Sequence, residues 1–213
     1  MQRRAVVAAA GRNEIFIFAP MKNIVFDLGG VLFARDPKRC RREVLEFFSF
    51  IREEPMPQFW VDFDCGLNSF DDVCRILAER SGAALSTCRD YLLYSIERQE
   101  VVAPTGELVA DLISAGYRLY VLSNMAREFI DFLRRMPVYA NFDGEVISCE
   151  EHVAKPSLEI YRILLSRYGF DPAQTLFIDD RQTNVDAART LGINAFRFDE
   201  PLSSCARLRA MLL

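Results

Sequence analysis

Several residue types are scarce in this 213-residue chain, and each scarcity excludes a class of function. His152 is the only histidine, so a zinc site or catalytic centre that needs two imidazoles cannot form within one chain. A Ser-His-Asp triad would depend entirely on this residue. Lysine occurs only as Lys22, Lys38 and Lys155, so the role of each lysine can be considered individually.

The cysteine pattern lacks the spacing of a metal site. Six cysteines are present and none belongs to a Cys-x-x-Cys pair; they stand at 40, 65, 74, 88, 149 and 205. Their neighbours are largely apolar, which favours reduced, buried thiols over a disulfide framework. We therefore expect a cytoplasmic protein.

Long apolar runs and an excess of basic residues are also missing. No run reaches the roughly 18 residues that a membrane helix needs. The formal net charge is −4, whereas proteins that bind nucleic acid need a basic surface. The sequence therefore predicts neither a membrane nor a nucleic-acid partner, and its 51% hydrophobic and 26% charged residues are typical of a soluble globular protein.

Residues 1–20 differ from the rest of the chain. They begin with basic residues, but a polar stretch at 11–14 interrupts the apolar segment that a secretion signal would need. We expect an N-terminal extension, in which 15–18 could form an edge strand. The regular pattern begins at Met21.

After Met21, short apolar runs rich in β-branched and aromatic residues alternate with longer helical patterns. The predicted strands are 23–27, 118–123, 143–148, 175–179 and 194–198. The predicted helices lie near 105–115, 125–135, 157–168, 182–191 and 202–212, with Gly116 and Gly192 as helix-ending glycines. This pattern predicts an α/β fold whose core has three layers, is Rossmann-like and contains a parallel sheet.

One interval breaks the alternation. Residues 37–103 contain no convincing strand, and three or four amphipathic helices are expected around 41–52, 71–81 and 86–97. The predicted domains are thus a core of residues 21–36 and 104–213 and a small α-helical cap of residues 37–103. Because the cap follows the first strand, it would cover the carboxyl edge of the sheet, where such sheets bind ligands.

Two predicted strands end in polar residues that suit a phosphate site. The first ends at Asp27, and Gly29 and Gly30 follow, which let the backbone approach a ligand. Another ends at Ser123 and Asn124, next to the start of a helix, where backbone N–H groups attract anions. A turn before two glycines and an ordinary helix cap remain alternatives for these residues.

Two further segments carry charge. Lys155 precedes Pro156 and a helix, and could neutralise a carboxylate and a phosphoryl group, or simply be solvated. Asp179 and Asp180 end a buried strand, where adjacent acids repel each other unless a cation is present. Carboxylate oxygens in small number suit Mg²⁺, with Asn184 holding the ligands in place. A helix-capping acidic pair is the alternative.

These four segments, in this order, resemble the motifs of the haloacid dehalogenase-like (HAD) hydrolase superfamily, over essentially all of residues 21–213. The resemblance implies a C1-type helical cap, with the segment 64–66 at the place of the substrate-specificity loop. The sequences DLGGVL, VLSN, KP and IDDRQTNVDAARTLG are most similar to the branch that contains α-D-glucose-1-phosphate phosphatase.

The resemblance also implies roles for individual residues. Asp27 would be the nucleophile, Lys155 would stabilise charge, and Ser123, Asn124 and Lys155 would bind the phosphoryl group. Mg²⁺ would be held by Asp27, the backbone carbonyl of Gly29, and Asp180, with Asp179 nearby. The expected activity is hydrolysis of a small phosphorylated metabolite, such as a sugar phosphate or sugar 1-phosphate, through an aspartyl phosphate.

Gly29 departs from the pattern of most phosphatases of the superfamily, which carry an acid two residues after the nucleophile. That acid protonates the leaving oxygen and then activates water, for about 10² to 10⁴ in rate. Three explanations stay open: a substrate with a good leaving group, another proton donor such as Asp36 or His152, or a weak catalyst that mainly binds. A haloacid dehalogenase also lacks this acid, but it needs no metal and would leave the acidic pair unpartnered.

Overall fold

The computed structural model describes residues 21–213, so the predicted N-terminal extension and its edge strand lie outside the described residues. A five-stranded parallel sheet with the strand order β5-β4-β1-β6-β7 forms the centre. Its strands are β1 (Asn23–Phe26), β4 (Arg118–Ser123), β5 (Gly144–Ile147), β6 (Thr175–Asp179) and β7 (Asn194–Arg197). All five strands predicted from the sequence are confirmed, within one residue at each end, and the α/β class with them.

Side chains alternate along the central strands between two hydrophobic clusters. On β1, Ile24 and Phe26 belong to one cluster and Val25 to the other. On β4, Leu119 and Val121 likewise face away from Tyr120. Because successive residues of a strand point to opposite faces, this alternation requires helices on both sides of the sheet.

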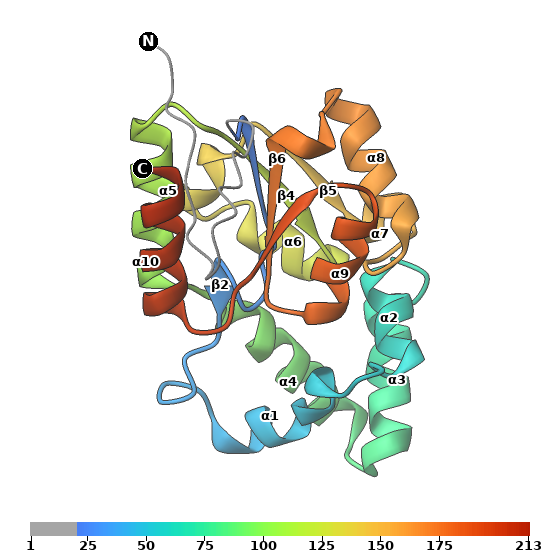
Figure 1. Cartoon of the computed structure of the whole chain (residues 1–213). Coiled ribbons are helices and arrows are strands. Elements are labelled where there is room, and N and C mark those ends of the chain that lie inside the picture. The colour runs from blue at the N-terminus through green and yellow to red at the C-terminus, as the bar shows by residue number, and fades with distance from the viewer. Residues whose placement is uncertain (1–20) are drawn as a thin grey trace.

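The helices supply both outer layers (Figure 1). One cluster takes residues from α5 (Ala103–Ser114), α6 (Arg127–Leu133) and α10 (Pro201–Leu212). The other takes residues from α8 (Leu158–Tyr168) and α9 (Gln182–Thr190). The expected helix-ending glycines Gly116 and Gly192 both have the left-handed conformation, at φ +79° and +77°. Three short helices complete the core: α7 (Ser148–Glu151), η2 (Pro137–Asn141) and η3 (Pro172–Gln174).

The helices between β1 and α5 lie in the lower part of Figure 1, and we call them the helical insertion. It comprises α1 (Arg42–Phe47), η1 (Ser49–Arg52), α2 (Gln58–Asp64), α3 (Phe70–Ser81) and α4 (Leu85–Glu97). Its own apolar cluster is rich in aromatic rings, with Trp60 packed against Phe48, Phe50 and Phe63. The bounds of the cap at residues 37–103 stay a prediction.

The structure corrects the expectations for this interval in two places. The helix expected over 41–52 is interrupted at Phe48, where α1 ends and the 3-10 turn η1 begins. A strand was not expected, yet β3 (Glu100–Val101) pairs antiparallel with β2 (Phe33–Ala34). Two residues are too short for a period-two pattern to be recognised, so this ribbon has no sequence signal. It joins the chain entering the insertion to the chain leaving it.

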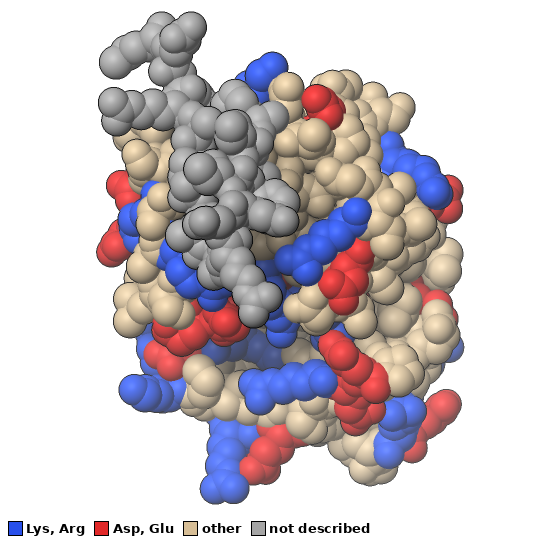
Figure 2. Space-filling model, viewed as in Figure 1, with Lys and Arg blue, Asp and Glu red and all other residues tan. Residues whose placement is uncertain are grey.

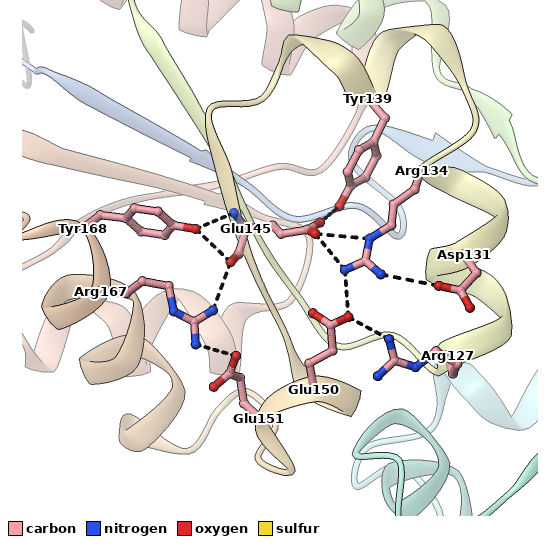
Figure 3. A network of polar contacts seen from close by, with 9 residues as sticks. All are labelled: Arg127, Asp131, Arg134, Tyr139, Glu145, Glu150, Glu151, Arg167 and Tyr168. Atoms are coloured by element: carbon pink, nitrogen blue, oxygen red, sulfur yellow. Dashed lines mark hydrogen bonds and ion pairs between the residues drawn. The ribbon is translucent and has the colours of Figure 1, made fainter.

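Ion pairs fasten β5 and α7 to the neighbouring helices. Arg134 binds Glu145 through Nη2 at 2.7 Å and Glu150 at 2.8 Å, and Tyr139 donates to Glu145 (Figure 3). Arg167 binds Glu151 on the other side. The network thus fixes the segment that follows β5 from two sides.

The surface is mixed in charge. On the face shown in Figure 2, acidic and basic side chains are interspersed over the core and the helical insertion. All six cysteines are free thiols, and five of them are buried. Within residues 21–213, no helix combines the length and apolar character needed to cross a membrane.

Candidate active site

Asp27 stands directly after β1, at the carboxyl edge of the sheet, and is 7% exposed. Its Oδ1 accepts a hydrogen bond from Ser123 Oγ at 2.8 Å. The turn that follows depends on Gly30, which has φ +77°. A Cβ at this position would lie 2.6 Å from Asp180 Oδ2, so only glycine lets the turn pass beside that carboxylate. Asp27, Ser123 and Asp180 therefore come together from three strands of one sheet edge.

Lys155 is the cation of this edge and is 5% exposed. Its Nζ lies 2.9 Å from Asp27 Oδ1 and 2.7 Å from Asp179 Oδ2. It also donates to the carbonyl oxygen of Leu122 at 2.8 Å. All three N–H donors of the ammonium group thus have acceptors, which compensates for the loss of water around the buried charge.

Three carboxylates converge at the site, from Asp27, Asp179 and Asp180, with oxygen atoms within 4.8 Å of one another. Asp179 is fully buried. Lys155 forms ion pairs with two of the three, Asp27 and Asp179. A group of carboxylate oxygens at the end of two adjacent strands matches the ligands that Mg²⁺ prefers, so the residues fit this ion.

The electrostatic cost of this cluster appears in the pKa values. Burial raises the pKa of Asp27 to about 7, against the attraction of Lys155, and Asp179 and Asp180 raise it further. Burial and the neighbouring Asp179 likewise raise the pKa of Asp180. Burial alone would lower the pKa of Lys155, but Asp179 and Asp27 outweigh it and the pKa lies above its ordinary value. The cluster is therefore stabilised by positive charge.

Asn184 and Asn124 hold the charged groups in place. Asn184 Nδ2 lies 3.0 and 3.1 Å from the two carboxylate oxygens of Asp179, from the first turn of α9. Asn124 accepts from the backbone N–H of Lys155 and donates to its carbonyl, both at 2.8 Å. The side chain of Asn124, expected to bind substrate, thus uses one N–H and its oxygen to fix Lys155, and its second N–H is available for a ligand.

Two further residues lie at the site: Arg181, for which the sequence predicts no role, and Asp64, which belongs to the segment expected as the substrate-specificity loop. Arg181 follows the acidic pair, and its Nη2 donates to the carbonyl oxygen of Ile51 in the helical insertion at 2.6 Å. Asp64 ends α2, and its carboxylate accepts a hydrogen bond from the backbone N–H of Ala126. Both lie where the insertion meets the carboxyl edge of the sheet, a contact that no local sequence pattern announces.

The two proton donors considered from the sequence have other contacts. Asp36 accepts from the backbone N–H of Lys38 at 2.9 Å within its own turn. His152 has φ +56°, and its Nδ1 lies 3.0 Å from the carbonyl oxygen of Cys65. A carbonyl oxygen only accepts, so Nδ1 carries the proton in this hydrogen bond. His152 therefore contacts the loop after α2.

Comparison with known proteins identifies the family. A sequence model of the family described as haloacid dehalogenase-like hydrolase matches residues 21–192. The chain belongs to this family. It is a hydrolase, and its parallel sheet with Asp27, Ser123, Lys155 and the acidic pair at the carboxyl edge is the arrangement expected from the resemblance.

Relatives of this HAD-like hydrolase include phosphatases. The chain is 28% identical to the sesquiterpene phosphatase astK of Aspergillus oryzae over 192 residues, which covers 90% of this chain and 96% of the relative. A predicted HAD-like family hydrolase from Porphyromonas gingivalis superposes with a TM-score of 0.68 at 28% identity, covering 90% of this chain and 98% of that one.

A third relative was crystallised with ligands. The HAD family enzyme bt-2542 from Bacteroides thetaiotaomicron, in complex with magnesium and inorganic phosphate, superposes with a TM-score of 0.65 at 26% identity. The match covers 83% of this chain and 93% of that enzyme. The carboxylate group of this chain thus occurs in a fold whose solved relative holds a divalent cation and phosphate.

Proposed function

We propose that this HAD-like hydrolase is a Mg²⁺-dependent phosphatase that acts through an aspartyl phosphate. One observation supports the proposal above all: the carboxylates of Asp27, Asp179 and Asp180 gather within 4.8 Å beside Lys155. Such a group of carboxylates costs free energy unless cations balance its negative charge, and costly charge clusters of this kind occur at functional sites. The phosphate and magnesium bound by the Bacteroides enzyme are consistent with this chemistry.

Asp27 is the proposed nucleophile. Both hydrogen-bonding partners of its carboxylate, Ser123 Oγ and Lys155 Nζ, contact Oδ1. These contacts orient the group and leave Oδ2 to attack phosphorus in line. The Asp27–phosphorus bond forms as the bond to the leaving oxygen breaks, and water then cleaves the aspartyl phosphate, which divides one difficult displacement into two.

Charge has to be balanced during both steps. Lys155 is the proposed catalytic cation, and it is proposed to bind the phosphoryl oxygens together with Ser123 and Asn124. Asp27, Asp180 and the backbone carbonyl of Gly29 would hold Mg²⁺, with Asp179 nearby and Asn184 orienting Asp179. When bound, Mg²⁺ offsets the repulsion between the nucleophile and the phosphate oxygens.

For the substrate we propose a small phosphorylated metabolite, with a sugar 1-phosphate as the first candidate and the helical insertion as a C1-type cap over the site. Gly29 supports this choice, because an anomeric sugar phosphate has a better leaving group than an alkyl phosphate and depends less on an acid. The similarity to the branch of α-D-glucose-1-phosphate phosphatase, which shares the glycine, points the same way.

An isoprenoid phosphate is the second candidate substrate. The helical insertion carries a connected set of aromatic rings, among which Phe50 and Phe59 are only half-buried and lie 5.4 Å apart by centroid. An apolar chain would pack on such rings. The relative from Aspergillus oryzae is named a sesquiterpene phosphatase, which agrees with this candidate.

The test is phosphate release from a panel of monoesters with and without Mg²⁺. The panel contains p-nitrophenyl phosphate, α-glucose 1-phosphate and farnesyl phosphate, with Asp27→Asn as the inactive control. We expect release that requires Mg²⁺ and Asp27. Release from none of a broad set of phosphate esters would contradict the proposal and favour a binding protein, whereas metal-independent chloride release from 2-chloropropionate would favour a dehalogenase.

A further inference from the structure

The proposed mechanism lacks a group that moves protons, because Gly29 replaces the usual acid. One carboxylate near the site has no part in metal binding or in attack on phosphorus. Asp64 is the last residue of α2 in the helical insertion. This residue is half-buried.

The end of α2 is held tightly against the core. The carbonyl oxygen of Asp64 accepts a hydrogen bond from Ser148 Oγ, which itself accepts from the backbone N–H of Met125 at 2.9 Å. The next carbonyl, of Cys65, is bound by His152. Met125 lies two residues after Ser123, so these contacts fasten the end of α2 to the loop that contacts Asp27.

Gly66 completes the contact between this loop and the core. A Cβ at Gly66 would lie 2.8 Å from the carbonyl oxygen of Cys149, so the backbone approaches more closely than any other residue allows. Arg181, which follows β6, donates a hydrogen bond to the carbonyl oxygen of Ile51 in the same insertion. The helical insertion is therefore attached to the core at two separate places.

The carboxyl of Asp64 interacts electrostatically with charged groups of the site. The backbone N–H of Ala126 donates to its carboxylate, and the charged groups that act on it are Arg181, Asp27 and Lys155. These groups come from three separate elements of the core, all at the carboxyl edge of the sheet. A phosphate ester bound at Asp27 would place its leaving group on the side of the helical insertion, because attack is in line.

We propose that Asp64 is the general acid and base of the reaction, in place of the acid absent at Gly29. This assignment rests on the proposed phosphatase function. In the first step the Asp64 carboxyl gives its proton to the leaving oxygen as the phosphorus–oxygen bond breaks, which yields an alcohol and a carboxylate. In the second step that carboxylate takes a proton from the attacking water, the Asp27–phosphorus bond breaks, and phosphate and the original Asp64 carboxyl are restored.

The surroundings of Asp64 suit both steps. Burial raises its pKa to about 7, against the attraction of Arg181 and the hydrogen bond from Ala126; Asp27 raises it and Lys155 lowers it. A group with this pKa can both lose and accept a proton near neutral pH. The nearest acid on its own helix, Asp62, accepts a hydrogen bond from Gln58 instead and serves as the matched control.

Two aryl phosphates of similar size test the acid role. The nitrophenolate of p-nitrophenyl phosphate leaves without a proton, whereas the phenolate of phenyl phosphate leaves far more readily when protonated. We expect Asp64→Asn to lose about 10²- to 10⁴-fold in kcat/KM for phenyl phosphate and much less for p-nitrophenyl phosphate. Asp62→Asn should change neither value.

Pre-steady-state kinetics test the base role in the same variant. With p-nitrophenyl phosphate, Asp64→Asn should release about one nitrophenolate per site in a rapid burst and then turn over slowly, because the aspartyl phosphate accumulates. Gly29→Asp should restore phenyl phosphate hydrolysis to Asp64→Asn. The Cβ position of Gly29 has no heavy atom within 4 Å, so the side chain has room.

The outcomes separate the two proposals. An equal loss on both aryl phosphates, without a burst and without rescue by Gly29→Asp, would show a structural role and overturn the assignment of Asp64 while leaving the phosphatase intact. Absence of Mg²⁺-dependent phosphate release from the unaltered enzyme would overturn the phosphatase itself, and the role of Asp64 with it.

Discussion

The ammonium of Lys155 lies 2.9 Å from Oδ1 of Asp27, the same oxygen that accepts a hydrogen bond from Ser123. Two donors on one oxygen fix the carboxylate plane and leave the second oxygen to react. The contact also ties stability to function, because Lys155 is the buried counterion of the acidic cluster.

Replacement of this lysine should therefore affect both properties. Lys155→Met leaves the carboxylates of Asp27 and Asp179 without the cation that contacts them, and we expect a loss of about 3 to 5 kcal/mol in the free energy of unfolding. The melting temperature should fall on the order of 10 °C, with phosphatase activity abolished. Mg²⁺ should raise the melting temperature of the variant more than that of the unaltered protein. An equal rise would contradict the view that Lys155 and Mg²⁺ balance the same negative charges. Lys38→Met, at an exposed lysine, is the control.

Gly30 should be required for Mg²⁺ binding. An alanine Cβ there would meet Asp180 Oδ2, whereas Gly82 has a similar φ of +72° with no heavy atom within 4 Å of its Cβ position. Gly30→Ala and Gly82→Ala should both lose about 1 to 2 kcal/mol to backbone strain. Only Gly30→Ala should weaken Mg²⁺ binding, by about 10- to 100-fold in calorimetric titration. Equal Mg²⁺ affinity in the two variants would contradict the role of Asp180 as a ligand of Mg²⁺.

The pH dependence of stability should reveal Asp64. Its pKa is raised from 3.8 to about 7 in the folded protein, so between these values the folded state binds more protons than the unfolded state. The free energy of unfolding therefore decreases through this source as pH rises from about 4 to about 7, and stays level above. The melting temperature of Asp64→Asn minus that of the unaltered protein, both measured without Mg²⁺, should therefore increase as pH rises over this range. A constant difference would contradict the raised pKa.

The ion-pair network around Arg134 should contribute to stability and not to catalysis. Arg134→Met removes bonds to Glu145 and Glu150 at 2.7 and 2.8 Å. We expect a loss of about 1.5 to 3 kcal/mol, seen as a fall in melting temperature of about 2 to 4 °C per kcal/mol, with kcat unchanged. Arg189→Met, which breaks an exposed pair 3.5 Å from Asp186, should cost less than about 1 kcal/mol. A loss of kcat in Arg134→Met would assign the network a catalytic role.

Much of the core was readable from the sequence, because its elements are determined locally. The five strands are apolar runs bounded by polar residues or glycine, and Gly116 and Gly192 end helices through a conformation that other residues avoid. The ribbon of β2 and β3 and the break at Phe48 were not readable. Their positions depend on how the helical insertion packs, and a local sequence pattern does not predict contacts between distant segments.

The same distinction applies to the site. Asp27, Ser123 and Asp179 end or directly follow strands that pair in one parallel sheet, so the sheet brings them together at its carboxyl edge. Asp64 and Arg181 meet them only because the end of α2 and the turn η1 fold back over the sheet edge. The raised pKa of Asp64 arises from that burial, which the residues next to it in the sequence do not predict.

The central claim is that Asp27 carries the phosphoryl group during turnover. Enzyme quenched in acid while it hydrolyses p-nitrophenyl phosphate with Mg²⁺ can be digested and its peptides analysed by mass spectrometry. We predict one phosphorylated peptide, with the phosphate on Asp27, and a larger phosphorylated fraction in Asp64→Asn. Phosphate release without any phosphorylated peptide in either protein, or with the phosphate on another residue, would contradict the account.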